Sequence, residues 1–205
     1  MQSHAMKPVA AALAILLVGA SGVADASEWI VRVGGHSVEP KSDNNSVVNV
    51  DSAQSLTFNV TYLFTPNWGV ELLAALPFKH DIDLNSDGSQ VAETKHLPPT
   101  LSLQYHFLPD GRIRPYAGLG LNATLFFDEK TTGALAGSDL SLDDSYGLAA
   151  QVGVDFDLSD VWLLNVDVRW FDIDADASVD GTSIGTVEID PYAFGVSIGR
   201  RFGGQ

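Results

Sequence analysis

Charged side chains recur inside segments of this sequence that are otherwise apolar, and they fall at alternate positions. Three arginines and three carboxylates are placed in this way: Arg32, Glu71, Asp155, Asp167, Arg169 and Arg201. Alternate residues of a β-strand point to the same face of a sheet. On a face closed to water an unpaired charge is strongly unfavourable, whereas a hydrogen-bonded ion pair is tolerated. We therefore expect a mutually neutralising polar plug, built from these residues together with Gln104 and Asn122.

Residue types used in catalysis and metal binding are present without the spacing that either function needs. His36, His80 and His96 have serines nearby, yet no nucleophile and base form a recognisable pair, so we expect no catalytic residues. The run Asp172-x-Asp174-x-Asp176 places carboxylates at alternate positions, but the glycine pattern of a calcium loop does not follow it. We expect a solvated acidic rim there, with no metal site and no cofactor.

The elements that must position these residues are strands, because the chain shows a hydrophobic period of two and almost no helical period. The alternating segments cover residues 28–38, 52–65, 68–79, 95–107, 114–127, 144–157, 161–173 and 188–202. Long and short connections alternate between them, and the long ones are residues 39–51, 80–94, 128–143 and 174–187. An even number of antiparallel segments with short turns at one end and long loops at the other is typical of outer-membrane barrels. The sequence therefore predicts an all-β fold, an eight-stranded antiparallel transmembrane β-barrel.

The two faces of the strands indicate which side meets lipid. One face carries only apolar residues, as in Leu56, Phe58 and Val60, while the opposite face carries the charges described above. A soluble barrel would turn the apolar face inward, but eight strands enclose only a small packed core. Aromatic residues such as Phe64, Trp68 and others gather beside the short turns, as an interfacial girdle requires. We expect the apolar face to point outward into a membrane.

Toward the long loops the inward positions change from polar to apolar. We expect them to line a funnel: Val38, Leu73, Ala75, Pro77, Pro98, Phe126, Phe171, Ile173 and Ile189. Such a funnel accepts small hydrophobic solutes, while the charges beneath it block their onward diffusion. Pro77 and Pro98-Pro99 remove ladder donors from adjacent strands at one level, which allows lateral exit into the bilayer. Two plainer interpretations stay open: the apolar residues merely fill the upper barrel, and the prolines mark where the strands splay apart.

Composition narrows the range of partners. The chain has 205 residues, no cysteine and a formal charge of -15, which excludes a disulfide scaffold and argues against nucleic acid. Most of this negative charge lies in the long connections, so contact with lipopolysaccharide would need bridging divalent cations. Outer-membrane lipid and lipopolysaccharide are the expected surroundings.

Residues 1–26 have the pattern of a cleaved signal peptide. Lys7 precedes the apolar run 9–20, and Ala24-Asp25-Ala26 supplies small residues at a cleavage site. The run is shorter than the ~20 residues of a membrane helix. A short buried helix is the alternative. We expect one domain over residues 27–205, with both termini in the periplasm.

Several motifs together resemble the OmpW family of eight-stranded outer-membrane proteins. They are Trp29-Ile30-Val31-Arg32-Val33-Gly34, Leu97-Pro98-Pro99-Thr100, Arg114-Pro115-Tyr116-Ala117-Gly118, Asp167-Val168-Arg169-Trp170, Ile189-Asp190-Pro191 and Gly199-Arg200-Arg201-Phe202. The resemblance implies a narrow barrel of the Gram-negative outer membrane that takes up small hydrophobic molecules. It also implies the barrel assembly machinery as a partner, although Gly203-Gly204-Gln205 follow the terminal aromatic Phe202. The alternative function is a passive structural or surface-interaction barrel, as in an adhesin or receptor, without transport.

Overall fold

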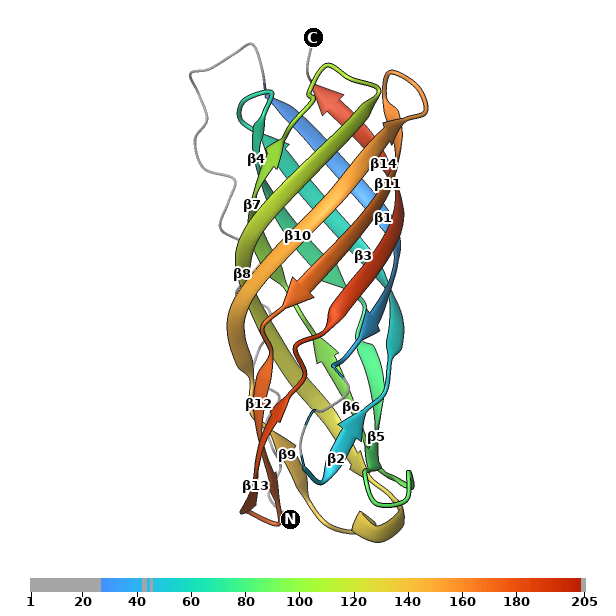
Figure 1. The fold of residues 1–205 in the computed structure, drawn as a ribbon, viewed down its shortest axis with the longest axis vertical. Coiled ribbons are helices and arrows are strands. Elements are labelled where there is room, and N and C mark those ends of the chain that lie inside the picture. Colours follow the sequence, from blue (N-terminus) through green and yellow to red (C-terminus); the bar gives the residue numbers. More distant parts are fainter. Residues whose placement is uncertain (1–26, 42–43, 45, 204–205) are drawn as a thin grey trace.

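The protein is a tall barrel of tilted strands (Figure 1). The computed structural model describes residues 27–41, 44 and 46–203, so the predicted signal peptide lies outside the described residues. Eight strands form the ring in the order β10-β11-β14-β1-β3-β4-β7-β8, and β8 pairs with β10 to close it. Their bounds are β1 Glu28–Glu39, β3 Ala53–Leu63, β4 Trp68–Ala75, β7 Thr100–His106, β8 Ile113–Thr131, β10 Ser145–Asp157, β11 Trp162–Phe171 and β14 Tyr192–Gly203. The predicted eight-stranded antiparallel barrel is confirmed.

The barrel continues beyond the ring into a second tier of shorter strands, which the sequence analysis had assigned to long loops. These are β2 Val48–Val50, β5 Phe78–Leu84, β6 Gln90–Leu97, β9 Leu140–Leu142, β12 Asp174–Val179 and β13 Thr182–Glu188, with one 3-10 turn, η2 Gly133–Leu135. β5 pairs with β6, and β12 pairs with β13 and β9. The expected long connections are therefore largely strands, and the ends of β5 and β6 extend into segments already predicted as strands. Their acidic side chains alternate with buried apolar ones, as in Ala175-Asp176-Ala177.

Turn chemistry explains one of these hairpins. Asp180 and Gly181 connect β12 to β13 with φ angles of 51° and 75°. An Asp-Gly pair with both residues at positive φ is the preferred two-residue hairpin connection. In the sequence, this Asp-Gly motif lies among many acidic residues, which favoured the interpretation of the segment as a loop.

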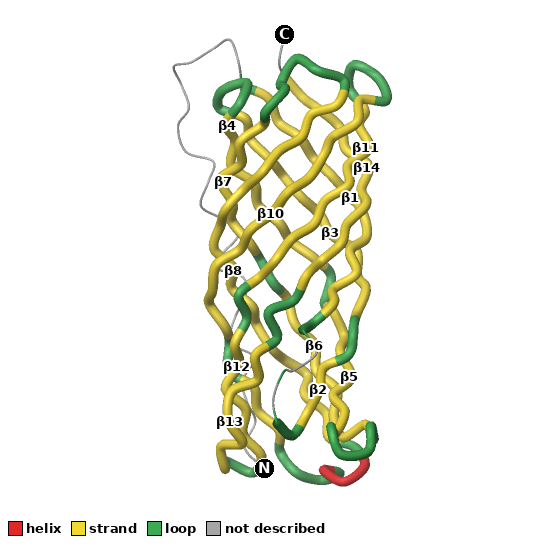
Figure 2. Tube along the Cα trace, in the orientation of Figure 1, coloured by secondary structure: helices red, strands yellow, loops and turns green. Residues whose placement is uncertain are grey.

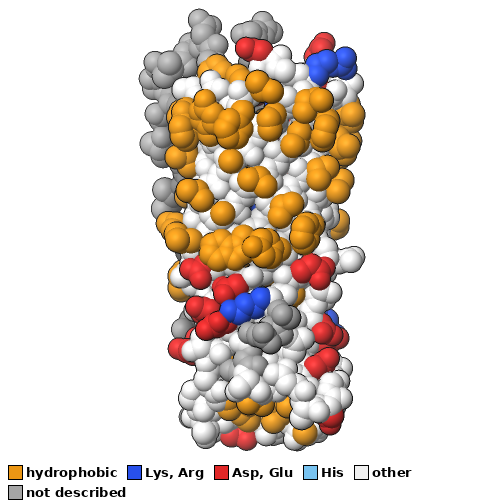
Figure 3. Space-filling view, in the orientation of Figure 1, with side chains coloured by type: hydrophobic (Ala, Val, Ile, Leu, Met, Phe, Trp, Pro, Cys, Tyr) orange, Lys and Arg blue, Asp and Glu red, His pale blue; other side chains and the backbone are white. Residues whose placement is uncertain are grey.

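The outer surface of the ring is apolar, and its inner surface is polar. Large apolar side chains are exposed around the ring, among them Leu56, Phe58, Val60, Leu101, Leu103, Leu119, Leu121, Val152, Val166 and Val196. Figure 3 shows them as a broad belt with charged residues beyond it on the side of the long connections. The outward-facing apolar belt fits a barrel embedded in lipid. No helix in the described part of the chain has the length and hydropathy to cross a membrane.

Candidate functional site

The lumen of the ring is crossed by a network of buried charges centred on Arg32. Its Nη2 lies 2.6 Å from Asp155 Oδ2 and its Nε 3.2 Å from Asp155 Oδ1, so β1 is tied to β10 across the barrel. Arg32 Nη1 donates to Thr61 Oγ1 at 2.9 Å and lies 3.4 Å from Glu71 Oε2. All three ionised side chains have no exposed surface.

Glu71 joins this arginine to a second one. Arg169 Nη1 donates to the other oxygen of Glu71 at 2.8 Å, and Arg169 Nε donates to Asp167 Oδ2 at 2.7 Å. His36 Nε2 lies 3.1 Å from the same Asp167 oxygen. We call Arg32, Glu71, Asp155, Asp167 and Arg169 the central network. Two guanidinium groups and three carboxylates alternate in it, so each charge is paired despite its burial.

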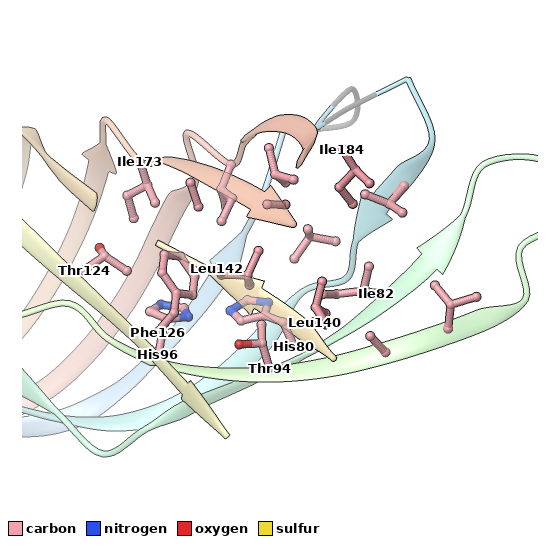
Figure 4. A pocket seen from close by; sticks show the side chains of 18 of the residues that line it. His80, Ile82, Thr94, His96, Thr124, Phe126, Leu140, Leu142, Ile173 and Ile184 are labelled. Atoms are coloured by element: carbon pink, nitrogen blue, oxygen red, sulfur yellow. The ribbon is translucent and has the colours of Figure 1, made fainter. Parts of the chain in front are cut away.

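An apolar pocket lies between the central network and the tips of the second-tier strands (Figure 4). It is lined mainly by aliphatic and aromatic side chains, including Val50, Ile82, Val91, Phe126, Leu135, Leu140, Leu142, Ile173, Ala177, Val187 and Ile189. Its cavity volume is about 40 Å³. That is room for about three water molecules. This space is smaller than a solute the size of ethylbenzene, so entry of such a solute would require the segments that cover the pocket, such as η2 and β9, to move outward.

The barrel wall is interrupted beneath this pocket. Leu73 and Thr100 form the last pair between β4 and β7, and Phe78 and His96 form the first pair between β5 and β6. Residues 74–77 and 97–99 lie between these pairs, and no ladder joins the two segments. Figure 2 shows loop segments interrupting the strands at this height. We call this break the seam.

Each side of the seam is still held by its other neighbour. Leu76 N donates to Leu56 O at 2.9 Å, and Ala123 N donates to Pro99 O at 3.0 Å. The seam therefore separates these two segments from each other and not from their other neighbours; farther along, the second-tier strands divide between two sheets, with β2, β5 and β6 in one and β9, β12 and β13 in the other. At the comparable strand junction near Pro191, Phe171 N still donates to Pro191 O at 3.2 Å.

Comparison with known proteins identifies the group to which this architecture belongs. The model of the OmpW family matches residues 23–202. The chain belongs to the OmpW family. Outer membrane protein W of Vibrio cholerae is 42% identical over 219 residues, covering 96% of this chain and 100% of that protein. The crystal structure of OprG from Pseudomonas aeruginosa has a TM-score of 0.78 and 35% identity, covering 87% of this chain and 97% of that one.

A more distant similarity concerns a protein named for its operon. The dibenzothiophene metabolism operon protein PahQ of Pseudomonas aeruginosa is 28% identical over 176 residues, covering 83% of this chain and 77% of that protein. As an OmpW-family member with this fold, the protein is a β-barrel of the Gram-negative outer membrane.

The structure places most of the residues expected for the plug of this OmpW-family barrel inside the lumen. Gln104 and Asn122 are buried, and Asn122 Nδ2 donates to Thr100 Oγ1 at 2.9 Å. Arg201 is set apart from the network. It lies near the periplasmic end of β14, where its guanidinium contacts Asp157 and Glu28.

The residues expected to line the funnel divide into four groups. Phe126, Ile173 and Ile189 line the pocket, and Val38, Leu73 and Phe171 are buried in the same apolar cluster, against which Ala75 packs. Pro98 is buried at the seam. Pro77 is exposed, so its assignment to the lining was wrong. The strand alternation that would have turned it inward is broken between Ala75 and Phe78.

The sequence analysis missed several lumen residues, among them Tyr116 and His36, and much of the pocket. Tyr116 is 2% exposed, with Asn165 Nδ2 donating to its hydroxyl at 3.1 Å, and Arg32 lies 5.6 Å from its ring centroid. Gly153 makes room for it, since a Cβ there would lie 2.5 Å from the tyrosine ring. His36 lies inside the ring, with its Nδ1 2.7 Å from Thr57 Oγ1. The alternation of apolar and polar residues in Val48-Asn49-Val50 is the sequence pattern that could have predicted a strand with inward-facing residues at the pocket.

The described residues form no arrangement that suggests a metal site or a catalytic group. Among residues 27–41, 44 and 46–203, no group of three or more His, Asp or Glu side chains is arranged to hold a metal ion. The buried carboxylates of the central network are each engaged by arginine.

The pocket carries two buried histidines whose burial predicts a pH dependence. Desolvation lowers the pKa of His80 below its usual 6.5, and burial lowers the pKa of His96 well below that value. Above pH 6.5 both rings are neutral whether the second tier is closed or open, so they contribute no pH dependence. As pH falls below 6.5 the open form takes up protons that the closed form does not, so the closed form loses stability. Amide hydrogen exchange in β5 and β6 is measured at pH 5 and at pH 7.5 and corrected for intrinsic exchange rates. We expect the corrected exchange to be faster at pH 5.

A double substitution provides the control for this effect. His80→Phe with His96→Phe removes both titrating groups and keeps aromatic volume in the pocket wall. Its protection in β5 and β6, corrected for intrinsic exchange, should vary little between the two pH values. Equal pH sensitivity in this variant and the wild type would assign the effect to other groups.

Proposed function

We propose that this OmpW-family barrel takes up small hydrophobic molecules across the outer membrane. A solute enters the apolar pocket from outside, where contact with aliphatic and aromatic side chains replaces contact with water. Beneath it the central network blocks the straight path, because an apolar molecule cannot replace the hydrogen bonds that those buried charges make. The solute then leaves sideways through the seam into the bilayer.

The observation that carries this proposal is the position of the seam along the barrel axis, next to the base of the pocket. The break begins beyond the pair Leu73–Thr100, on the side of the central network, and ends at the pair Phe78–His96, whose histidine lines the pocket. An unpaired wall therefore adjoins the base of an apolar pocket and opens toward lipid. The name of the related protein PahQ, which places it in an operon for metabolism of an apolar aromatic compound, is consistent with such a solute.

Uptake by cells tests the proposal. Cells with and without the protein are given labelled alkanes, monocyclic terpenes and a polar solute such as glycerol, and uptake is normalised to folded protein in the outer membrane. We expect faster uptake of the apolar solutes only. Equal uptake with and without the protein would contradict transport.

The second candidate is a passive barrel whose outer surface binds other surfaces. The acidic second tier supports it, because its strands are held as a defined surface by ion pairs such as Lys79–Glu93 at 2.6 Å and Lys95–Asp128 at 2.9 Å. In either function, outer-membrane lipid, lipopolysaccharide and the barrel assembly machinery are the partners that the location implies. Loss of surface attachment with unchanged uptake would favour this second candidate.

A further inference from the structure

One wall of the apolar pocket contains three polar side chains with unused hydrogen-bonding atoms. His80, Thr94 and His96 are 2%, 3% and 4% exposed and line the pocket. His80 Nε2, Thr94 Oγ1 and His96 Nδ1 are buried without a hydrogen-bond partner among the described residues. Buried polar atoms in proteins are nearly always paired, so three such atoms in one apolar wall need an explanation.

Strand pairing brings the three side chains together. His80 on β5 is directly opposite Thr94 on β6, and directly opposite residues in an antiparallel pair have neighbouring side chains. The ring of His96 stacks on the ring of His80 with centroids 4.9 Å apart and an interplanar angle of 18°. Figure 4 shows both rings and Thr94 on one side of the pocket, with Ile173, Leu142 and Ile184 also around it. We call His80, Thr94 and His96 the polar spot.

The hydrogen-bonding role of His80 is fixed by its second nitrogen. His80 Nδ1 lies 2.5 Å from the backbone oxygen of Asp51, which can only accept a hydrogen bond. The proton of the neutral ring is therefore on Nδ1, and Nε2 presents a lone pair to the pocket. Thr94 Oγ1 can both donate and accept. The polar spot thus offers an acceptor at His80 Nε2 beside a hydroxyl that can donate.

Fixed charges are kept off this wall. The charged neighbours on β5 and β6 are Lys79, Asp81, Glu93 and Lys95, and each alternates with the inward residues, so it points to the other face. Lys79 and Lys95 are engaged on that face by Glu93 and Asp128. The described residues that line the pocket therefore include no lysine or arginine to neutralise an anionic ligand.

We propose that the polar spot selects apolar solutes bearing one neutral hydroxyl group, that is, phenols and hydrophobic alcohols. The ligand hydroxyl donates to His80 Nε2 and its oxygen accepts from Thr94 Oγ1, while the rest of the ligand lies against the aliphatic walls. A plain hydrocarbon leaves both atoms unpaired, and a carboxylate has no proton for His80 Nε2. This selectivity rests on the proposed function, because it concerns the same pocket.

Matched ligands test the selectivity. Binding of 4-ethylphenol, ethylbenzene and 4-ethylbenzoate to the purified full-length protein in phosphatidylcholine vesicles is measured at pH 7.5, with partitioning into empty vesicles subtracted. One buried hydrogen bond corresponds to about a fivefold to tenfold change in affinity. We expect 4-ethylphenol to bind about tenfold more tightly than ethylbenzene, with 4-ethylbenzoate the weakest.

Two variants remove the atoms of the polar spot and a third serves as control. Thr94→Val removes the hydroxyl at nearly constant shape, and His80→Phe removes the acceptor and keeps an aromatic ring. Both should lose the preference for 4-ethylphenol while still binding ethylbenzene. Thr124→Val is the control, because Thr124 also lines the pocket but already donates to Asn122 Oδ1 at 2.6 Å. This control should keep the preference.

The possible outcomes separate the selectivity from the proposed function. If the wild type binds ethylbenzene and 4-ethylphenol equally, the selectivity is overturned and hydrophobic uptake stands. If neither compound binds, both proposals fail. A preference that persists in Thr94→Val and His80→Phe, or that appears only when Zn²⁺ is added, would also overturn the selectivity. Retained ethylbenzene binding in each variant shows that its pocket is folded.

Discussion

Replacing Arg169 by leucine should destabilise the folded barrel by about 3–5 kcal/mol, because it leaves buried Asp167 without an arginine and Glu71 with only its 3.4 Å contact to Arg32. Arg169 Nη1 lies 2.8 Å from Glu71 and Arg169 Nε 2.7 Å from Asp167, and all three side chains are at most 1% exposed. Leucine fills part of the space but supplies no donor. The free energy of unfolding in lipid vesicles, followed by tryptophan fluorescence in urea, measures the loss directly.

An arginine outside the lumen provides the control for this substitution. Arg200 lies on the outer face of the same barrel, with its guanidinium 5.0 Å from the Phe202 ring centroid and 5.6 Å from that of Trp162. Arg200→Leu should lower the free energy of unfolding by about 0.5–1 kcal/mol, the size of an exposed cation–π contact. The contrast tests whether burial of the charge, rather than removal of any arginine, determines the effect.

A second substitution tests the reason for the loss. Glu71→Gln removes the carboxylate that loses its shorter ion pair in Arg169→Leu, so the double variant should be less destabilised than the two single effects added together. Strict additivity, or a loss below about 1 kcal/mol for Arg169→Leu, would mean that water already solvates these charges.

The sequence predicted the members of the central network better than their partners. Alternation with apolar neighbours identifies Arg32, Glu71 and Asp167 as inward-facing, since the period of a strand is two. It does not reveal which of them meet. Arg32 and Asp155 are separated by 123 positions and Arg169 and Glu71 by 98. Such pairs depend on strand order, on the closure between β8 and β10 and on relative stagger, which no local pattern contains.

The second tier shows a different limit of sequence reasoning. Its strands are short and strongly acidic on their outer face, so charge density suggested loops where apolar alternation was also present. The boundaries of the seam were missed for a related reason. Period-two patterning runs through residues 68–79 and 95–107 almost without interruption, yet the pairing partner changes between Ala75 and Phe78 and between Leu97 and Thr100. A change of pairing can leave the alternation in the sequence nearly intact although the alternation of buried and exposed residues is broken, as it is at Leu76 and Pro77.

The pocket and the seam are separable steps of the proposed transport, and substitutions at each should reduce uptake differently. Leu73 is 3% exposed within the apolar cluster that includes the pocket. Leu73→Asp places a charge beside the path of the solute, so uptake of a labelled alkane should fall to the level of cells lacking the protein. Leu73→Ala also reduces side-chain volume but adds no charge, and it should retain uptake if polarity is the barrier.

Pro98→Val addresses the exit. Continuing the register of β4 and β7 past the pair Leu73–Thr100 would place residue 98 opposite Ala75, and proline has no N–H with which to extend the ladder. Valine supplies that donor, and one added hydrogen bond of about 1 kcal/mol shifts an opening equilibrium about fivefold toward the closed seam. The variant should therefore bind alkane as the wild type does and deliver it about fivefold more slowly.

The matched control for the exit is Pro191→Val, at the junction where Phe171 N still donates to Pro191 O. Its uptake should remain at the wild-type level, since that boundary is already bonded and valine keeps an apolar side chain where Pro191 lines the pocket. Uptake is normalised to folded protein in the outer membrane, so a variant that assembles poorly is not mistaken for a closed one. If Leu73→Asp and Pro98→Val both transport alkane at the wild-type rate, the solute does not pass between the pocket and the seam, and the passive surface-binding barrel becomes the better account of this fold.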